Sequence, residues 1–140
     1  MVGLPGSGKS TYLERLGVIP LSSDWLRQVL SDDITDQTIH ERVFHSIRYL
    51  LRHRLAIGRP VTYIDATHLT VEERQPYVQL ASWYGCKLEA IFFDVPLEIC
   101  RERNRRRQRV VPEEALEKMA AKLERPTLTE GFCRVTVLSS

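Results

Sequence analysis

The motif Gly-x-x-x-x-Gly-Lys-Ser at residues 3–10 is the feature that most constrains the fold of this chain. Glycines allow positive φ angles and, because they lack a Cβ atom, let backbone N–H groups approach a polyanion closely. The pattern is typical of a phosphate-binding loop that opens a helix. We therefore expect Lys9 to contact the β- and γ-phosphates of a nucleotide, and the Ser10 hydroxyl to bind Mg²⁺. The residues assigned to nucleotide binding here are Gly3, Pro5, Gly6, Ser7, Gly8, Lys9, Ser10 and Thr11.

The residues on either side of this loop supply half of the context that the motif requires. A helix is expected over residues 10–16, with Leu13 and Leu16 toward the core. A buried strand should precede the loop, but only Met1 and Val2 stand before Gly3. The first strand is therefore expected to be very short or truncated.

Length and composition predict a single domain over residues 1–140 with one core. The net charge of +2 is too small to indicate nucleic-acid binding by itself. Cys86, Cys100 and Cys133 are odd in number and widely spaced, which favours buried reduced thiols over a zinc site or disulfides. The chain shows no leader-like start and no apolar run long enough for a bilayer, so we expect a cytoplasmic protein without membrane contact.

A carboxylate and an arginine follow the second expected strand, at residues 18–21. That strand ends at Ser22, Ser23 and Asp24, and a short helix over residues 25–30 places Arg27 on the same face as Asp24. Open α/β sheets hold ligands at the carboxyl ends of their strands. We expect Asp24 to accept the proton of an attacking hydroxyl group; helix capping by Ser23 and Asp24 is the structural alternative.

Two further groups of titratable residues could belong to a metal site. Asp65 ends the next expected strand, at residues 61–65, and is predicted either to orient Mg²⁺ or to act as a cap or turn residue. His40, Glu41 and His45 lie on a long amphipathic helix expected over residues 37–57. Their spacing differs by one from that of zinc proteases, so we interpret the histidines as ordinary surface or boundary residues.

The remaining chain alternates helices and strands, which predicts an α/β fold with a parallel sheet flanked by helices. A helix over 70–84 should begin with a capping box of Thr70 and Glu73. An apolar strand over 86–95 should be buried on both faces. Pro96 and Pro112 are each expected at the first helical position, and 132–138 forms the last strand.

An arginine-rich segment lies late in the chain, with no alternating carboxylates after Glu102 to relieve its repulsion. We expect it to form a lid, at about residues 101–112, beside a polyphosphate. Together with the phosphate loop and the acid after the second strand, such a lid favours a kinase, and no guanine-binding Asn-Lys-x-Asp segment is present. Its members are Arg101, Arg103, Arg105, Arg106, Arg107 and Arg109.

These features together resemble the polynucleotide 5′-hydroxyl kinases, which include the kinase modules of RNA- and DNA-end repair enzymes. The pieces that carry the resemblance follow one another along nearly the whole chain. They are residues 3–11, Ser23-Asp24-x-x-Arg27, residues 64–67 and 93–96, Arg103-Asn104-x-x-Arg107 with Val111-Pro112, and residues 126–128 with 130–132. His68 stands where an asparagine is common in this family.

The resemblance implies a P-loop kinase with ATP and Mg²⁺ as cofactors and a single-stranded nucleic-acid 5′ end as its partner. It implies that Asp24 is the general base and that Arg27 holds a phosphate of the acceptor strand. Arg103 and Arg107 would belong to the lid, with Arg107 near the transferred phosphate, and residues 126–132 would lie near the adenine. Removing Asp24 is expected to abolish transfer while leaving ATP binding nearly intact.

Two other functions use the same features. A P-loop kinase of a small metabolite, such as a nucleoside, a sugar or an antibiotic, or a relative of the zeta-type toxins, shares the loop, the acid and the arginine lid. A nucleotide-binding module without turnover needs only the loop. A polynucleotide acceptor predicts a positive groove and strong salt dependence, whereas a metabolite kinase predicts a closed pocket.

Overall fold

The computed structural model describes residues 1–107 and 111–139, and the chain folds into two compact units. Unit 1 consists of Met1–Tyr12 and Thr67–Ser140, and unit 2 of Leu13–Ala66. Helix α1 (Lys9–Leu16) begins in unit 1 and ends in unit 2. The single domain expected over residues 1–140 stays a prediction.

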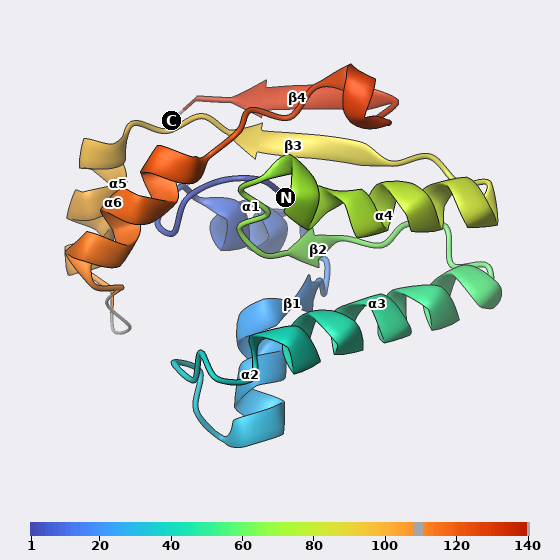
Figure 1. Ribbon diagram of the computed structural model, residues 1–140, viewed down its shortest axis with the longest axis horizontal. Helices are drawn as coiled ribbons and strands as arrows, with labels where there is room; N and C mark the ends of the chain where they lie inside the picture. The colour runs from blue at the N-terminus through green and yellow to red at the C-terminus, as the bar shows by residue number, and fades with distance from the viewer. Residues whose placement is uncertain (108–110, 140) are drawn as a thin grey trace. The chain divides into compact units, whose positions relative to one another are not determined.

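The sheet of unit 1 is built around β3 (Glu89–Phe93), which pairs in parallel with β4 (Arg134–Leu138) (Figure 1). Phe92 also forms a parallel bridge with Val2, so β3 lies between β4 and the start of the chain. In this sequence the pairing that precedes the loop consists of this bridge, and whether the first strand is short or truncated stays a prediction. Ala90, Phe92 and Phe93 are buried, which confirms a strand that is covered on both faces.

The helices of unit 1 are α4 (Val71–Tyr84), α5 (Leu97–Arg105), α6 (Glu113–Lys122) and the short 3₁₀ turn η1 (Leu128–Glu130). Pro96 and Pro112 were expected at the first helical position, but each is the N-cap, one residue earlier. Their ψ angles of 144° and 138° are extended, so helical geometry starts only at the following residue. The helices cover a core that includes Leu4, Phe93, Cys100 and Leu116.

Unit 2 contains a second parallel pair, β1 (Leu21–Ser22) with β2 (Ile64–Asp65). Both strands are shorter than the expected 18–21 and 61–65. Pro20 precedes β1 directly and has no N–H to donate to a ladder, and Ile19 is 96% exposed. In register, Ser22 stands opposite Asp65, so the residues that follow both strands lie at the same end.

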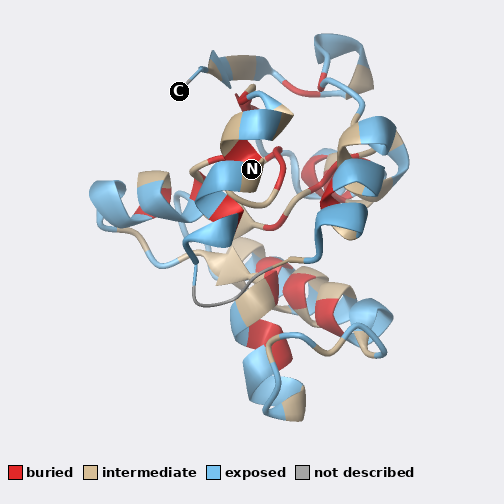
Figure 2. Cartoon of the chain, turned by 90° about the vertical axis from the view of Figure 1, so that its left-hand side faces the viewer, coloured by how far each residue is buried: buried red, intermediate tan, exposed pale blue. Residues whose placement is uncertain are grey.

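The helices of unit 2 are α2 (Ser23–Ser31) and α3 (His40–Ala56). Helix α2 begins two residues earlier than expected because the Ser22 hydroxyl accepts the N–H of Trp25 at 3.3 Å and caps the helix. Ser23 and Asp24 therefore lie in the first helical turn. Val43, Ile47 and Leu51 form the buried side of α3; Figure 2 shows buried residues in red.

The cysteines are free, as expected, but only one of them is buried. Cys100 lies in the core of unit 1, where burial raises the pKa of its thiol. Cys86 and Cys133 stand just outside the strands β3 and β4 and are exposed, which corrects the expectation of three buried thiols. None of the helices within the described residues has the length and apolar character of a membrane span.

Candidate functional site

The phosphate loop between Gly3 and Lys9 is closed on itself and packed against α5. A Cβ atom at Gly3 would lie 2.7 Å from Ser7 Oγ, and one at Gly6 would lie 2.9 Å from the Cys100 carbonyl oxygen. Gly6 also has a φ of +83°, a left-handed value that favours glycine. The Ser7 hydroxyl is buried inside the loop and has no hydrogen-bond partner among the described residues. A side chain at Gly3 would therefore crowd the buried Ser7 hydroxyl, and one at Gly6 would disturb the packing of the loop on α5.

Lys9 places its charge against the backbone of this loop. Its ammonium group donates to the Gly3 carbonyl at 2.9 Å and to the Leu4 carbonyl at 2.8 Å, and the residue is 8% exposed. Lys9 is also the first residue of α1, whose N-terminal N–H groups and dipole favour an anion at the same place. Ser10 and Thr11 follow in the first turn and are exposed.

The residues of the loop fit a nucleotide triphosphate with Mg²⁺. Backbone N–H groups, an ammonium group and the buried Ser7 hydroxyl are the donors that phosphate oxygens need. The part of the chain that the structure describes contains no cluster of three or more histidine, cysteine, aspartate or glutamate side chains for a metal. Magnesium bound through nucleotide phosphates needs only one or two protein ligands, so Ser10 stays a suitable candidate.

A tight turn at residues 67–69 holds the backbone that leads into the loop. The Thr67 carbonyl accepts the N–H of Gly3 at 3.0 Å, and His68 Nδ1 donates to the Met1 carbonyl at 2.7 Å. His68 has a φ of +46°, which asparagine also tolerates. Burial lowers the pKa of His68 to about 3, so the ring is neutral and its Nδ1 carries the proton. Sequence reasoning noted His68 only as a departure from a family pattern.

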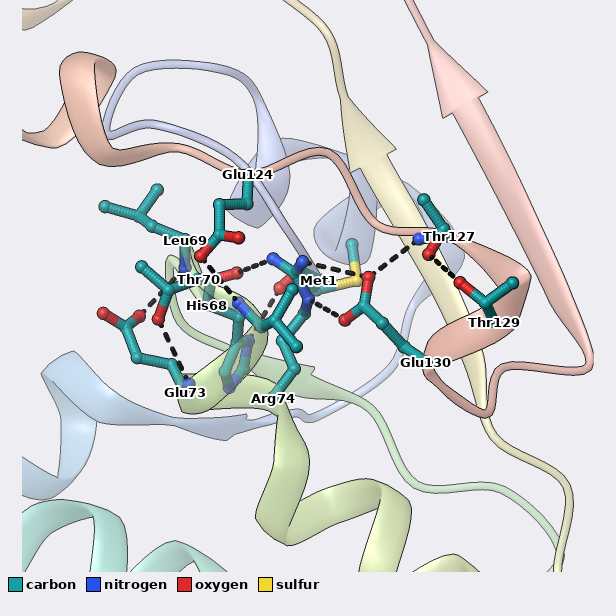
Figure 3. A network of polar contacts seen from close by, with 11 residues as sticks. Met1, His68, Leu69, Thr70, Glu73, Arg74, Glu124, Thr127, Thr129 and Glu130 are labelled. Carbon is teal, nitrogen blue, oxygen red and sulfur yellow. Dashed lines mark hydrogen bonds and ion pairs between the residues drawn. The ribbon is translucent and has the colours of Figure 1, made fainter.

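Arg74 ties this turn to η1, as Figure 3 shows. Its guanidinium donates to the His68 carbonyl at 2.9 Å and to both Glu130 carboxylate oxygens, at 2.8 and 3.1 Å. Both side chains are buried, with 3% and 6% exposed. Glu130 also accepts the N–H of Thr127 at 2.8 Å and completes a capping box with it. This pair was not predicted, because its members are 56 positions apart along the chain.

The capping box expected at Thr70 and Glu73 is present in altered form. The Thr70 hydroxyl accepts the N–H of Glu73 at 3.1 Å, as expected. The Glu73 carboxylate reaches past Thr70 and accepts the N–H of Leu69 at 2.9 Å. Glu73 thereby adds one more hydrogen bond to the turn at residues 67–69, which supports the phosphate loop.

The arginine-rich segment is only partly what the sequence suggested. Arg103 Nη1 donates to the Gly6 carbonyl at 3.3 Å, so this arginine does lie at the phosphate loop. Arg107 is exposed, and its place near a transferred phosphate stays a prediction. Arg109 and the part of the expected lid at residues 108–110 lie outside the described residues.

Carboxylates neutralise three of the other arginines, which corrects the expectation of unrelieved repulsion. Arg101 pairs with Glu98 and Glu117. Arg105 pairs with Glu113 at 2.6 Å, and Arg106 pairs with Glu102 at 2.6 Å. Two of these acids, Glu113 and Glu117, come from α6, which the one-dimensional charge pattern did not bring beside α5.

Asn104 is a structural residue that sequence reasoning missed. Its side chain is fully buried and uses both ends of its amide on the backbone of Val111: Nδ2 donates to the carbonyl at 2.6 Å, and Oδ1 accepts the N–H at 3.0 Å. The end of α5 is thereby fastened to the residue that precedes Pro112 and α6.

The acceptor-side residues predicted from the sequence gather in unit 2. Arg27 Nη1 lies 3.9 Å from Asp24 Oδ1, and Arg27 Nη2 lies 3.2 Å from His40 Nδ1. The Arg27 side chain is 7% exposed, whereas that of Asp24 is 39% exposed. His40 and His45 are exposed, as expected of surface histidines, although the contact of His40 with Arg27 was not foreseen.

Asp65 lies at the same end of the β1–β2 pair as these residues. Its backbone carbonyl accepts a long hydrogen bond of 3.5 Å from the Ser23 hydroxyl, next to Asp24. Whether its carboxylate serves a metal stays a prediction. Lys9, Ser10 and Arg103 thus belong to unit 1, and Asp24, Arg27 and Asp65 to unit 2.

Comparison with known proteins gives one family and several distant relatives. The profile of a family described as "AAA domain" matches residues 1–126. Human L-seryl-tRNA(Sec) kinase is 35% identical over 79 residues, 56% of this chain and 22% of that protein. The mouse L-seryl-tRNA(Sec) kinase is 33% identical over 72 residues, 51% of this chain and 20% of that protein.

A third relative aligns along nearly the whole chain. The bifunctional polynucleotide phosphatase/kinase of Schizosaccharomyces pombe (strain 972 / ATCC 24843) is 25% identical over 140 residues, 96% of this chain and 31% of that protein. The chain thus spans between about a fifth and a third of the length of these curated relatives.

Proposed function

Because this chain belongs to the AAA domain family and is a P-loop kinase domain, we propose that it transfers the γ-phosphate of ATP to the 5′-hydroxyl end of a single-stranded polynucleotide. The observation that carries the proposal is the buried Lys9 ammonium across the Gly3 and Leu4 carbonyls, at the start of a helix. This arrangement supports a phosphate-binding role for the loop, and the distant relatives support a kinase.

On the nucleotide side, the loop residues bind and orient the terminal phosphates. When a nucleotide binds, the Lys9 ammonium group would exchange its two carbonyl partners for phosphate oxygens, and the Ser7 hydroxyl would offer one further donor. Ser10 would hold Mg²⁺, and Arg103, already at the Gly6 carbonyl, would contribute a second cation at the loop. Bound ATP and Mg²⁺ supply the phosphoryl group and neutralise its charge.

On the acceptor side, Asp24 would accept the proton of the attacking hydroxyl group. Its side chain is accessible at the first turn of α2, whereas Arg27 is buried beneath it and fixed by His40. A carboxylate with one accessible face can meet a hydroxyl group at hydrogen-bond distance. Arg27 would hold a phosphate of the acceptor strand and orient Asp24, and Arg107 would act at the transferred phosphate.

A second candidate acceptor is a hydroxyl group carried on a tRNA. The stretch of 79 residues that is 35% identical to human L-seryl-tRNA(Sec) kinase favours it. The Schizosaccharomyces pombe relative aligns with far more of the chain, and for that reason we place the polynucleotide 5′ end first. Both candidates share a nucleic acid beside the reacting hydroxyl group.

The test is transfer of label from γ-labelled ATP in the presence of Mg²⁺ to three acceptors. These are a 5′-hydroxyl oligonucleotide, the same oligonucleotide with a 5′-phosphate, and seryl-tRNA. Label on the 5′-hydroxyl oligonucleotide alone supports the proposal, and label on seryl-tRNA alone replaces it with the second candidate. Absence of label on the 5′-hydroxyl oligonucleotide and on seryl-tRNA would refute both.

Two variants distinguish the loss of the proposed general base from a general disturbance of helix α2. Asp24→Asn should abolish transfer while ATP binding is retained. Asp32→Asn is the matched control: Asp32 caps the other end of α2 at a φ of +60°, which asparagine accommodates. Turnover by Asp24→Asn that equals that of Asp32→Asn would contradict the base assignment.

A further inference from the structure

Helix α3 and the residues that follow it carry an excess of positive charge, and Glu41, in the first turn of α3, is the acid of this helix. Five arginines and no aspartate or glutamate occur from residue 42 to residue 59. Arg42 and Arg52 are exposed, and Arg48 is half-buried. The acids of unit 2 precede this stretch, apart from Asp65.

Contacts in the structure do not neutralise these charges. Within the described residues, Arg42, Arg48 and Arg52 form no ion pair, and Arg54 bonds to neutral oxygens of Thr62 and Val61. The arginines at residues 101–106 are different, because Arg101, Arg105 and Arg106 are paired with glutamates. Among the described residues, α3 therefore carries three arginines that form no ion pair.

Most exposed residues of α3 lie along one face, whose first turn also carries the exposed Glu41. Arg42, His45, Tyr49 and Arg52 recur at intervals of three and four, which places them along one side of a helix. That side lies away from Val43, Ile47 and Leu51, which are buried. Arg42 and Arg52 are ten residues apart, or about 15 Å along the axis. We call Arg42, His45, Arg48, Tyr49 and Arg52 the α3 basic face.

Tyr49 adds an aromatic surface among these cations. It is 57% exposed, and its ring meets His53 edge-on with centroids 4.6 Å apart. Bases of single strands stack on such rings without regard to sequence, while arginines follow the phosphates. Arg48 and Arg52, four residues apart, repel each other on the helix, and an anionic strand would relieve this repulsion.

We propose that the α3 basic face binds the phosphate backbone of a single-stranded nucleic acid, downstream of the 5′ end that is phosphorylated. The proposal rests on the proposed function. Helices α2 and α3 belong to the same unit, and the Arg27–His40 contact joins the acceptor residues to the first residue of α3. The face makes acceptor affinity depend on strand length and on salt, which a small metabolite would not show.

The test compares two double variants with equal changes of net charge in the full chain. Arg42→Gln/Arg52→Gln removes two cations of the face, and glutamine matches arginine in helix propensity. Lys118→Gln/Arg134→Gln is the control, because these exposed cations lie in unit 1 and already pair with Glu114 and Glu89. Fluorescence anisotropy measures binding of a 5′-hydroxyl oligonucleotide of about 16 nucleotides between about 50 and 200 mM salt. Transfer kinetics are measured with this oligonucleotide and with a dinucleotide.

The α3 variant should reduce the slope of log K against log salt by about 1.4, since each phosphate contact with a single strand contributes about 0.7. KM for the longer oligonucleotide should rise about ten-fold, with kcat and the dinucleotide KM unchanged. The control variant should behave as the unmodified protein.

The outcomes separate this inference from the proposed function. Equal losses in both double variants would show an effect of net charge and overturn the α3 basic face. Transfer to the dinucleotide and to the longer strand with the same KM would overturn the face and leave the proposed function standing. Binding that depends on α3 without any transfer would support the face and refute the function.

Discussion

Replacing Arg74 by methionine is expected to destabilise the protein by about 3–5 kcal/mol, the range for breaking a buried ion pair. Arg74 makes three hydrogen bonds, two of them to Glu130, and its side chain is 3% exposed. Methionine fills much of the volume but leaves the Glu130 carboxylate buried with the Thr127 N–H as its remaining bond among the described residues. Against a total stability of about 5–15 kcal/mol, the loss is large.

Urea denaturation followed by far-UV circular dichroism measures this loss, with Arg134→Met as the control. Arg134 also pairs with a glutamate, but the two side chains are 73% and 53% exposed, so its loss should cost no more than about 1 kcal/mol. Glu130→Gln should cost nearly as much as Arg74→Met, and the double variant should cost less than their sum. Strict additivity, or an Arg74→Met effect no larger than that of Arg134→Met, would refute this account of the pair.

Three further predictions concern the loop, its support and the acceptor residues. Gly6→Ala should weaken ATP binding, measured by calorimetry, and should destabilise the protein more than Gly17→Ala does. The reason is that a Cβ at Gly6 meets the Cys100 carbonyl at 2.9 Å, whereas one at Gly17 meets nothing within 4 Å. Equal effects of the two variants would contradict the close packing of the loop. The His68 pKa of about 3 lies below the ordinary histidine value of 6.5, so the unfolded chain takes up a proton at a higher pH than the folded protein does. The contribution of the neutral His68 ring to stability is therefore complete above pH 6.5. It is lost by about 1.4 kcal/mol per pH unit as the pH falls toward 3. His68→Asn should keep the stability near neutral pH and remove this slope in urea titrations; an unchanged slope would contradict it. Asp24→Asn should lower kcat by at least about 100-fold with the Kd for ATP unchanged, and a parallel loss of ATP binding would argue for a structural role.

Much of the fold could be predicted because its signals are local. The phosphate loop, the helix after it and the amphipathic α3 are each specified by spacing within a few residues. The lengths of β1 and β2 were overestimated because β-branched residues such as Ile19 and Val61 also occur beside prolines, which cannot donate to a ladder. The N-caps were misplaced by one or two residues, since Ser22, Pro96 and Pro112 could each stand at either position.

The long-range part of the candidate site could not be predicted in this way. Arg74 and Glu130 look like ordinary surface charges in the sequence, and only the tertiary structure brings them together. Two of the acids that neutralise Arg101 and Arg105, Glu117 and Glu113, lie on α6, so the arginine-rich segment appeared more exposed to repulsion than it is. Conversely, the charge on α3 was overlooked because the hydrophobic repeat of that helix drew attention to its buried side.

The two bonds between Asn104 and Val111 have a consequence for how this protein can vary. They join the last turn of α5 to the residue before Pro112, seven positions further along the chain. A side-chain amide offers a donor and an acceptor on one planar group, so aspartate or leucine at position 104 would leave at least one polar group of Val111 without this bond. Position 104 should therefore tolerate substitution poorly, although its side chain makes neither of these bonds to the phosphate loop.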